Sequence, residues 1–116
     1  FYAKADGTEP AKEFLLSLDV KMRAKMLRTI SMLETNGYAL REPCSKALDD
    51  GIFELRAKVG SNITRVLYFF VVDRRAILTN GFVKKTQKTP QNEIELAKKY
   101  RADFLNRNRR NDHDKL

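Results

Sequence analysis

The side chains best suited to chemistry lie on one face of a predicted β-hairpin. Two strands are expected at residues 52–58 and 63–72, because both runs are rich in β-branched and aromatic residues and a Gly-Ser-Asn turn separates them. Symmetric pairing about this turn places Arg56 directly opposite Arg65, with Glu54 on the same face. The other face then carries mostly apolar and aromatic side chains, and a slip of one residue would put Arg65 into the core. The pattern therefore predicts a single register.

Two opposed arginines, with Lys58 on the same face, suit a phosphodiester substrate. The planar guanidinium matches two phosphate oxygens, and fixed cations stabilise negative charge that develops in the transition state. Attack by the 2′-hydroxyl of RNA needs in-line geometry, a proton acceptor and a proton donor, but no metal. A lysine crowded by other cations gives up its proton more readily and is a candidate base. The alternative is structural: like charges opposite each other cost stability, and Glu54 would then neutralise them.

A basic segment follows the third predicted strand, residues 76–83, next to the central strand. One of two adjacent lysines there should point towards the arginines, and a β-bulge at Gly81 would decide which. Such a charge run is also typical of a solvated loop, and RNA binding without catalysis would use the same residues. The predicted catalytic residues are Arg56, Arg65, Lys84 and Lys85. The predicted RNA contacts are Lys58, Lys88 and Glu54, and no metal ligand is expected. The general base stays open among Lys58, Lys84, Lys85 and Glu54.

The charge of the 116-residue chain is unevenly distributed. Residues 1–55 hold 8 Lys+Arg and 9 Asp+Glu, whereas residues 56–116 hold 15 and 6, so the net charge of +8 comes from the second half. A localised positive field attracts polyanions, above all nucleic acid. The alternative is that the basic residues only keep a small protein soluble.

The residue types exclude several kinds of site. Cys44 is the single cysteine, which excludes an internal disulfide and a cysteine-rich zinc site and fits a reducing cytoplasm. The single histidine, His113, lies in a polar terminal stretch, so a histidine-dependent triad or dyad is not expected. The longest apolar run, residues 66–72, has the length of a strand and is far short of the ~18 residues of a membrane span. We expect no cofactor and no membrane contact.

Two helices are predicted before the hairpin. The first has Thr8 as its cap and Pro10 in its first turn, and it ends near Leu18. Asp19 caps the second helix, which ends before Gly37. The buried stripe of this second helix has apolar residues at helical spacing: Met22, Met26, Ile30 and Leu33.

The complete architecture is then an α+β fold with helices and sheet in two layers. The sheet is four-stranded and mainly antiparallel, with residues 1–4 as an edge strand, and it packs against the N-terminal helical hairpin and a C-terminal helix. Residues 41–51 are expected to form a loop. The last helix, capped by Thr89, closes a single domain of residues 1–106, and residues 107–116 form a polar tail.

Four segments of the sequence resemble the phage-derived, HigB-like branch of the RelE toxin superfamily. They are residues 51–56 (GIFELR), 65–70 (RVLYFF), 81–90 (GFVKKTQKTP) and 93–97 (EIELA). The third segment is the most specific, and the resemblance covers nearly the whole chain up to about residue 106. It implies a microbial RNase-like fold and ribosome-dependent cleavage of messenger RNA in the cytoplasm. It also implies a cognate HigA-like antitoxin with a helix-turn-helix, bound in a toxin–antitoxin hetero-oligomer.

The resemblance carries residue roles as well. Basic positions of the family's site match Arg56, Arg65, Lys84 and Lys85. Other members use histidines or a C-terminal tyrosine, but no histidine is available here and Tyr100 is better explained as a core residue. Two other readings stay open. One is a basic RNA- or DNA-binding protein without catalysis, whose basic residues would spread over the helices; the other is a relic that only binds an antitoxin.

Overall fold

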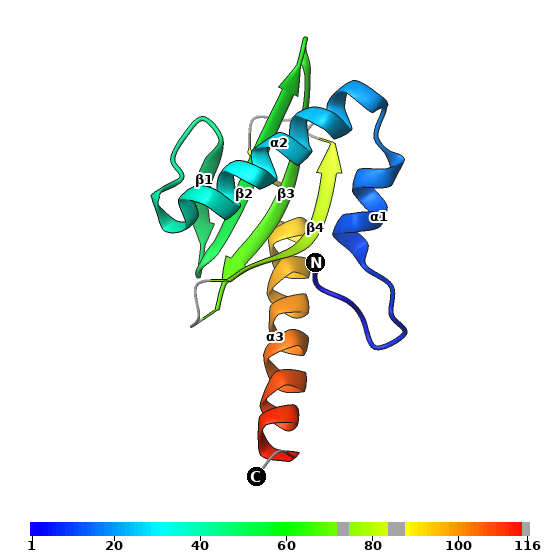
Figure 1. Ribbon diagram of the computed structural model, residues 1–116, viewed down its shortest axis with the longest axis vertical. Helices are drawn as coiled ribbons and strands as arrows, with labels where there is room; N and C mark the ends of the chain where they lie inside the picture. The colour runs from blue at the N-terminus through cyan, green and yellow to red at the C-terminus, as the bar shows by residue number, and fades with distance from the viewer. Residues whose placement is uncertain (72–74, 84–87, 115–116) are drawn as a thin grey trace.

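The computed structural model describes residues 1–71, 75–83 and 88–114, with side chains as far as residue 108. The helical elements are α1 (Pro10–Ser17), α2 (Val20–Asn36), the 3-10 turn η1 (Gly37–Ala39) and α3 (Gln91–Asp114). The strands are β1 (Ser45–Asp49), β2 (Ile52–Val59), β3 (Asn62–Phe70) and β4 (Ala76–Val83). They form one antiparallel sheet in the order β1-β2-β3-β4 (Figure 1). The predicted α+β class, with a helical hairpin before the sheet and a helix after it, is confirmed.

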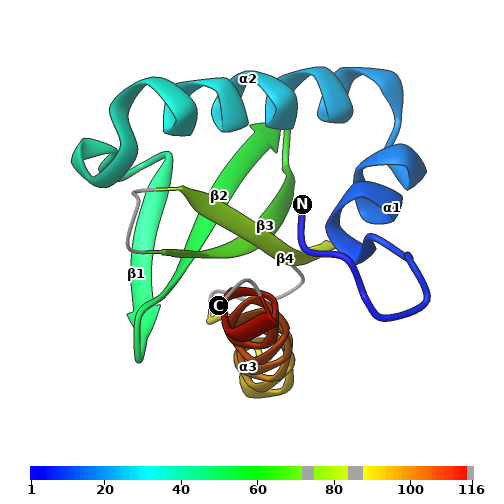
Figure 2. The ribbon, with the colours of Figure 1, turned by 60° about the horizontal axis from the view of Figure 1, so that its bottom comes forward.

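The helices lie on both faces of the sheet, so the fold has three layers. Figure 2 shows α1 and α2 on one side of the strands and α3 on the other. One core cluster lies under the hairpin and includes Met26, Leu55 and Val66; a second lies under α3 and includes Leu67 and Phe69. The predicted two-layer arrangement is therefore wrong. The central strand β3 carries apolar residues on both of its faces, and burying both requires a helix on each side.

Helix α2 forms largely as its sequence predicts. The Asp19 carboxylate accepts a hydrogen bond from the backbone N–H of Met22 at 2.9 Å, and Gly37, at φ 52°, ends the helix. The predicted apolar stripe faces the sheet. The cap of α1 was predicted wrongly: Glu9, rather than Thr8, is the residue before the helix. The carbonyls at the end of α1 are held by Arg23, whose guanidinium donates to three of them.

The fourth strand is not the one predicted. Residues 1–4 are not a strand, although the Tyr2 N–H donates to the Leu78 carbonyl of β4 at 2.9 Å. Strand β1 lies instead within the segment predicted to be a loop. It pairs with β2 through a turn at Asp50 and Gly51, which both have positive φ, at 49° and 77°. Two consecutive residues with positive φ give the twist that a tight hairpin needs, and Asp-Gly favours that geometry.

The predicted register of β2 and β3 is confirmed, with Arg56 paired to Arg65. Between β3 and β4 the register shifts after Leu67, so the irregularity falls at Thr79, two residues before the predicted position at Gly81. Gly81 has a different role, because a Cβ there would overlap the ring of Phe14 on α1. Glycine therefore lets α1 approach β4 closely.

Helix α3 differs from its prediction at both ends. Its first turn is closed on the Pro90 carbonyl, which accepts from the N–H groups of Glu93 and Ile94, so Thr89 is not the cap. At the other end the helix continues to Asp114, beyond the predicted end near residue 106, and projects past the sheet (Figure 1). The division into a domain of residues 1–106 and a tail stays a prediction. Tyr100 packs in the core under α3, as predicted, stacked on Tyr2 at 4.6 Å between ring centroids.

Candidate functional site

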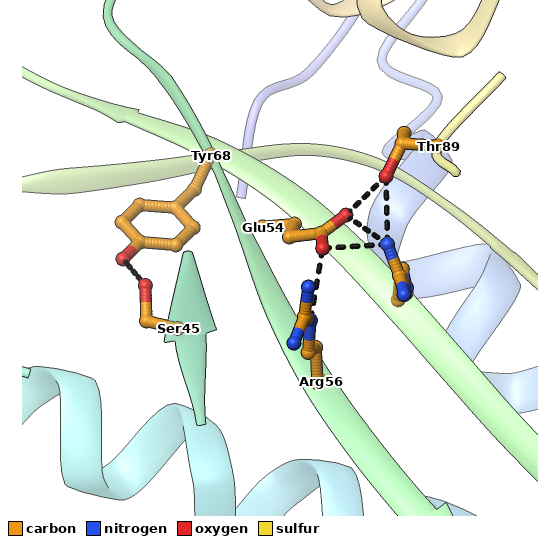
Figure 3. A network of polar contacts seen from close by, with 6 residues as sticks. Ser45, Glu54, Arg56, Tyr68 and Thr89 are labelled. Carbon is orange, nitrogen blue, oxygen red and sulfur yellow. Dashed lines mark hydrogen bonds and ion pairs between the residues drawn. The ribbon is translucent and has the colours of Figure 1, made fainter. Parts of the chain in front are cut away.

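The carboxylate of Glu54 lies at the centre of a buried network of polar contacts. It accepts a hydrogen bond from Arg56 Nε at 2.9 Å and from Arg65 Nη1 at 2.6 and 2.8 Å. The hydroxyl of Thr89, just before α3, donates to the other side of the carboxylate at 2.5 Å and accepts from Arg65 Nη1 at 2.7 Å. Figure 3 shows Arg56 and Thr89 pointing at Glu54 from different elements. The network thus ties β2, β3 and the start of α3 together.

Burial and hydrogen bonding act against each other on Glu54. Glu54 is fully buried and Arg65 is 2% exposed. Burial alone would raise the pKa of Glu54, but hydrogen bonds from Thr89, Arg65 and Arg56 outweigh it and hold the pKa below its ordinary value of 4.5. The carboxylate is therefore ionised at neutral pH. Its single negative charge is shared by the two opposed arginines and offsets one of their two positive charges, so the structural alternative that the sequence left open holds in part.

The arginines differ in what they can reach. Arg56 keeps a quarter of its side chain exposed, whereas Arg65 is almost completely enclosed. Within the described ranges the hydrogen bonds of Arg65 all leave from Nη1, and its buried Nε has no partner there. Arg56 is thus the better candidate for direct contact with a substrate, and Arg65 is held as a fixed charge behind it.

A large basic pocket opens beside these arginines, with a volume of about 690 Å³. It lies where β2 runs on past the end of its pairing with β1, between the tip of the β2–β3 hairpin and α2. None of the described residues that line it is acidic. They are Lys25, Arg28, Thr29, Met32, Pro43, Cys44, Arg56, Lys58, Gly60, Ile63 and Arg65. We call this cavity the basic pocket.

A smaller pocket of about 280 Å³ lies on the other side of Arg65, between β1 and the start of α3. The exposed side chain of Lys88 lines it, together with Lys46 and Thr89. Arg65 borders both cavities, so one buried guanidinium separates two surfaces that carry lysines.

The structure brings together five of the seven residues predicted for the site. Glu54, Arg56 and Arg65 form the network, Lys58 lies in the basic pocket and Lys88 in the smaller one. Lys84 and Lys85 lie outside the described residues. Among the described residues no group of His, Cys, Asp or Glu could hold a metal ion.

The sheet face that bears the arginines is less accessible than the predicted two-layer arrangement implies. The start of α3 covers part of it, so that Glu54, Arg65, Leu67 and Phe69 are buried. Sequence reasoning also missed three residues of the site: Thr89, taken for a helix cap, and Lys25 and Arg28 of α2. The last two had a signal, since these two cations are three residues apart on a face of α2 beside its core stripe.

A second short contact lies on the α2 side of the sheet and is separate from this network. The hydroxyls of Tyr68 and Ser45 are 2.5 Å apart (Figure 3). Burial raises the pKa of Tyr68, and the hydrogen bond with Ser45 lowers it only in part. Both residues are enclosed in the core, so this tyrosine stays protonated and does not reach the basic pocket.

The fold and the site define a small α+β protein with a basic pocket built on a sheet and braced by buried ion pairs. Residues 13–102 match the model of a family described as phage-derived protein Gp49-like (DUF891), and the chain belongs to this family. It is a toxin-like family of the RelE/HigB type. No curated protein matches the sequence. Among the described residues, no helix is both long and apolar enough to cross a membrane.

Proposed function

We propose that this protein is the toxin of a type II toxin–antitoxin system, of the HigB kind, and that it cuts messenger RNA on the ribosome. The observation that carries the proposal is the convergence of Arg56, Lys58 and Arg65 on one pocket without an acidic lining residue among those described. The alternative of a protein that only binds nucleic acid expects basic residues spread over the helices. The convergence of Arg56 and Lys58 beside the buried, pre-organised guanidinium of Arg65 favours catalysis.

In the proposed reaction the RNA 2′-hydroxyl loses its proton and attacks the adjacent phosphorus. The bond from phosphorus to the 5′-oxygen breaks and that oxygen takes up a proton, which leaves a 2′,3′-cyclic phosphate and a 5′-hydroxyl. Arg56 would bind a non-bridging oxygen, since its guanidinium is partly exposed, and Arg65 would add fixed positive charge behind it. Lys58 is the described candidate for the proton acceptor, because it is exposed in the same pocket. Lys84 and Lys85 stay candidates from the sequence.

Glu54 fits a positioning role better than the role of general base. A base must reach the proton that it takes, but this carboxylate is fully buried and its oxygens already accept hydrogen bonds from three side chains. Its bond to Arg56 Nε instead fixes the plane of the exposed guanidinium. We therefore place Glu54 behind the arginines, where it sets their orientation.

The proposed function includes a partner and a place of action. A ribosomal target places the protein in the cytoplasm. A HigA-like antitoxin would silence it in a hetero-oligomer, either by covering the basic pocket or by gripping the N-terminal helices and blocking entry to the ribosome. Covering the pocket predicts that Arg56→Ala weakens antitoxin binding and that association slows steeply as salt rises. Remote blocking predicts normal binding by this variant.

Cell-free translation tests the enzyme proposal. Purified protein is added to a translation reaction, and mRNA ends are mapped by primer extension. We expect new ends at ribosomal A-site codons with the wild-type protein and at least a hundredfold slower cleavage with Arg56→Ala, the usual cost of one lost transition-state donor. Intact mRNA at high protein concentration would reject the enzyme. Equally fast cutting of naked mRNA would reject the dependence on the ribosome.

A further inference from the structure

One wall of the basic pocket comes from α2, which the predicted site does not include. Lys25, Arg28, Thr29 and Met32 line it, and these positions follow the i, i+3, i+4, i+7 spacing of a single helix face. The core stripe of α2 lies beside this face. Thr29 is buried, and its hydroxyl donates to the Lys25 carbonyl at 3.1 Å. The two cations and Met32 therefore lie on one helix face that is anchored to the protein by buried Thr29.

The cations on this wall lack carboxylate partners within the described part of the chain. No ion pair there involves Lys25, Arg28 or, across the pocket, Lys58. Arg56, by contrast, is paired with Glu54. Uncompensated cations on opposite walls of one cavity repel each other, and an anion between them relieves that repulsion.

We propose that Lys25 and Arg28 bind the backbone of single-stranded RNA, at a phosphate next to the one that Arg56 addresses. This inference deepens the proposed function and rests on it for the identity of the RNA. The strand would lie in the cleft between α2 and the free edge of β2. Met32 and Ile63, which also line the cleft, offer apolar surface on which a base can rest.

The place of the α2 cations favours RNA over an acidic protein segment. The cavity of about 690 Å³ is within the range of roughly 300–1,000 Å³ that is usual for ligand pockets, so it can take one nucleotide unit of a strand. The α2 cations also share this one cavity with Arg56 and Arg65, so a strand bound at the reaction site passes them.

The test is binding of a single-stranded RNA hexamer with 2′-O-methyl groups, which cannot be cleaved by its own hydroxyl. Fluorescence anisotropy at several salt concentrations compares wild type with the double variant Lys25→Ala/Arg28→Ala. We expect affinity to fall about tenfold or more, and the slope of log K against log salt to become shallower by about 0.7, the contribution of one phosphate contact on a single strand. Lys25→Arg/Arg28→Lys keeps both charges and should bind within about twofold of wild type.

The matched control is Lys21→Ala, which removes an exposed cation from the same helix but outside the basic pocket. It should leave affinity and slope nearly unchanged. Equal effects of the control and the double variant would overturn the proposal, as would a wild-type protein that does not bind the hexamer. A double variant that loses only an acidic peptide, hexaglutamate, would overturn it in favour of a protein partner.

Hexamer binding and ribosomal cleavage can fail separately. If the double variant loses hexamer affinity while wild type cuts no mRNA, the RNA site on α2 is supported and the proposed reaction is not. If wild type cuts mRNA and the double variant binds the hexamer normally, the inference about α2 fails and the enzyme stands.

Discussion

Replacing Glu54 with glutamine removes one charge from a fully buried polar site and keeps the shape of the side chain. The variant leaves Arg65 as an uncompensated cation that is 2% exposed, and it places an amide NH₂ where donors from Arg65 and Thr89 now point. Breaking a buried ion pair by removing one partner costs about 3–5 kcal/mol. That is a large part of the roughly 5–15 kcal/mol by which small proteins are stable.

Urea denaturation measures the loss of unfolding free energy, and a double variant shows how much of it comes from the charge left without its partner. Glu54→Gln should lower the free energy of unfolding by about 3–5 kcal/mol. The exposed Glu34 of α2 supplies a control, because Glu34→Gln makes the same chemical change and should stay within about 0.5 kcal/mol of wild type. Glu54→Leu/Arg65→Met, which replaces both charges with apolar side chains, should cost clearly less than the sum of its two single changes.

The free energy of unfolding in acid should depend on the same carboxylate. The pKa of Glu54 is lower in the folded chain than its ordinary value of 4.5. Its contribution to stability is therefore complete above about pH 4.5 and is lost as the pH falls through the folded value. Wild type should lose this increment on acidification, and Glu54→Gln should not. A stability loss below 1 kcal/mol at pH 7, with the same acid profile in both proteins, would refute the central place of Glu54 in the fold.

Three further changes test other contacts. Arg23→Ala should lower the free energy of unfolding by about 1.5–3 kcal/mol, because its guanidinium donates to three carbonyls at the end of α1, at 2.9–3.1 Å; full recovery of stability with Arg23→Lys would contradict this reason. Gly81→Ala should cost about 1–3 kcal/mol in thermal unfolding, and Phe14→Leu in the same chain should recover part of it, since the new methyl group meets that ring. Tyr2 donates a hydrogen bond to Asp103 at 2.6 Å, and burial together with this contact raises the pKa of Tyr2 to about 12. The contribution of Tyr2 to the free energy of unfolding is therefore complete below about pH 10 and is lost as the pH rises through 12. Tyr2→Phe should flatten the alkaline stability profile, and an unchanged profile would reject the assignment.

The sequence predicts the β2–β3 hairpin and the Arg56–Arg65 pair because two independent signals agree there. The turn fixes the register, and the alternation of apolar residues allows no other. The same residues also indicate the third layer, formed by α3, that the sequence analysis does not predict. Residues 66–72 are a continuous apolar run, which is typical of a strand covered on both faces, whereas charged neighbours made one face look open to solvent.

Other features depend on contacts between distant residues and have no local signature. Thr89 before Pro90 is typical of a helix start, but its hydroxyl instead joins a carboxylate 35 residues earlier in the chain. The Asp50-Gly51 dipeptide is a strong hairpin signal, but β1 is too short to stand out and owes its position to pairing with β2. Lys25 and Arg28 belong to the site only because α2 crosses the sheet at the free edge of β2.

The most direct test of the proposed reaction uses ribosomes programmed with one defined mRNA, prepared in two forms. The forms differ by a single 2′-deoxynucleotide on the 5′ side of the bond cut in the A site. We expect the wild-type protein to cut the all-ribose mRNA to a 2′,3′-cyclic phosphate end and to leave the substituted mRNA intact at that bond. Cleavage of both forms at the same rate would contradict attack by the 2′-hydroxyl. Failure to cut either form would contradict the enzyme itself.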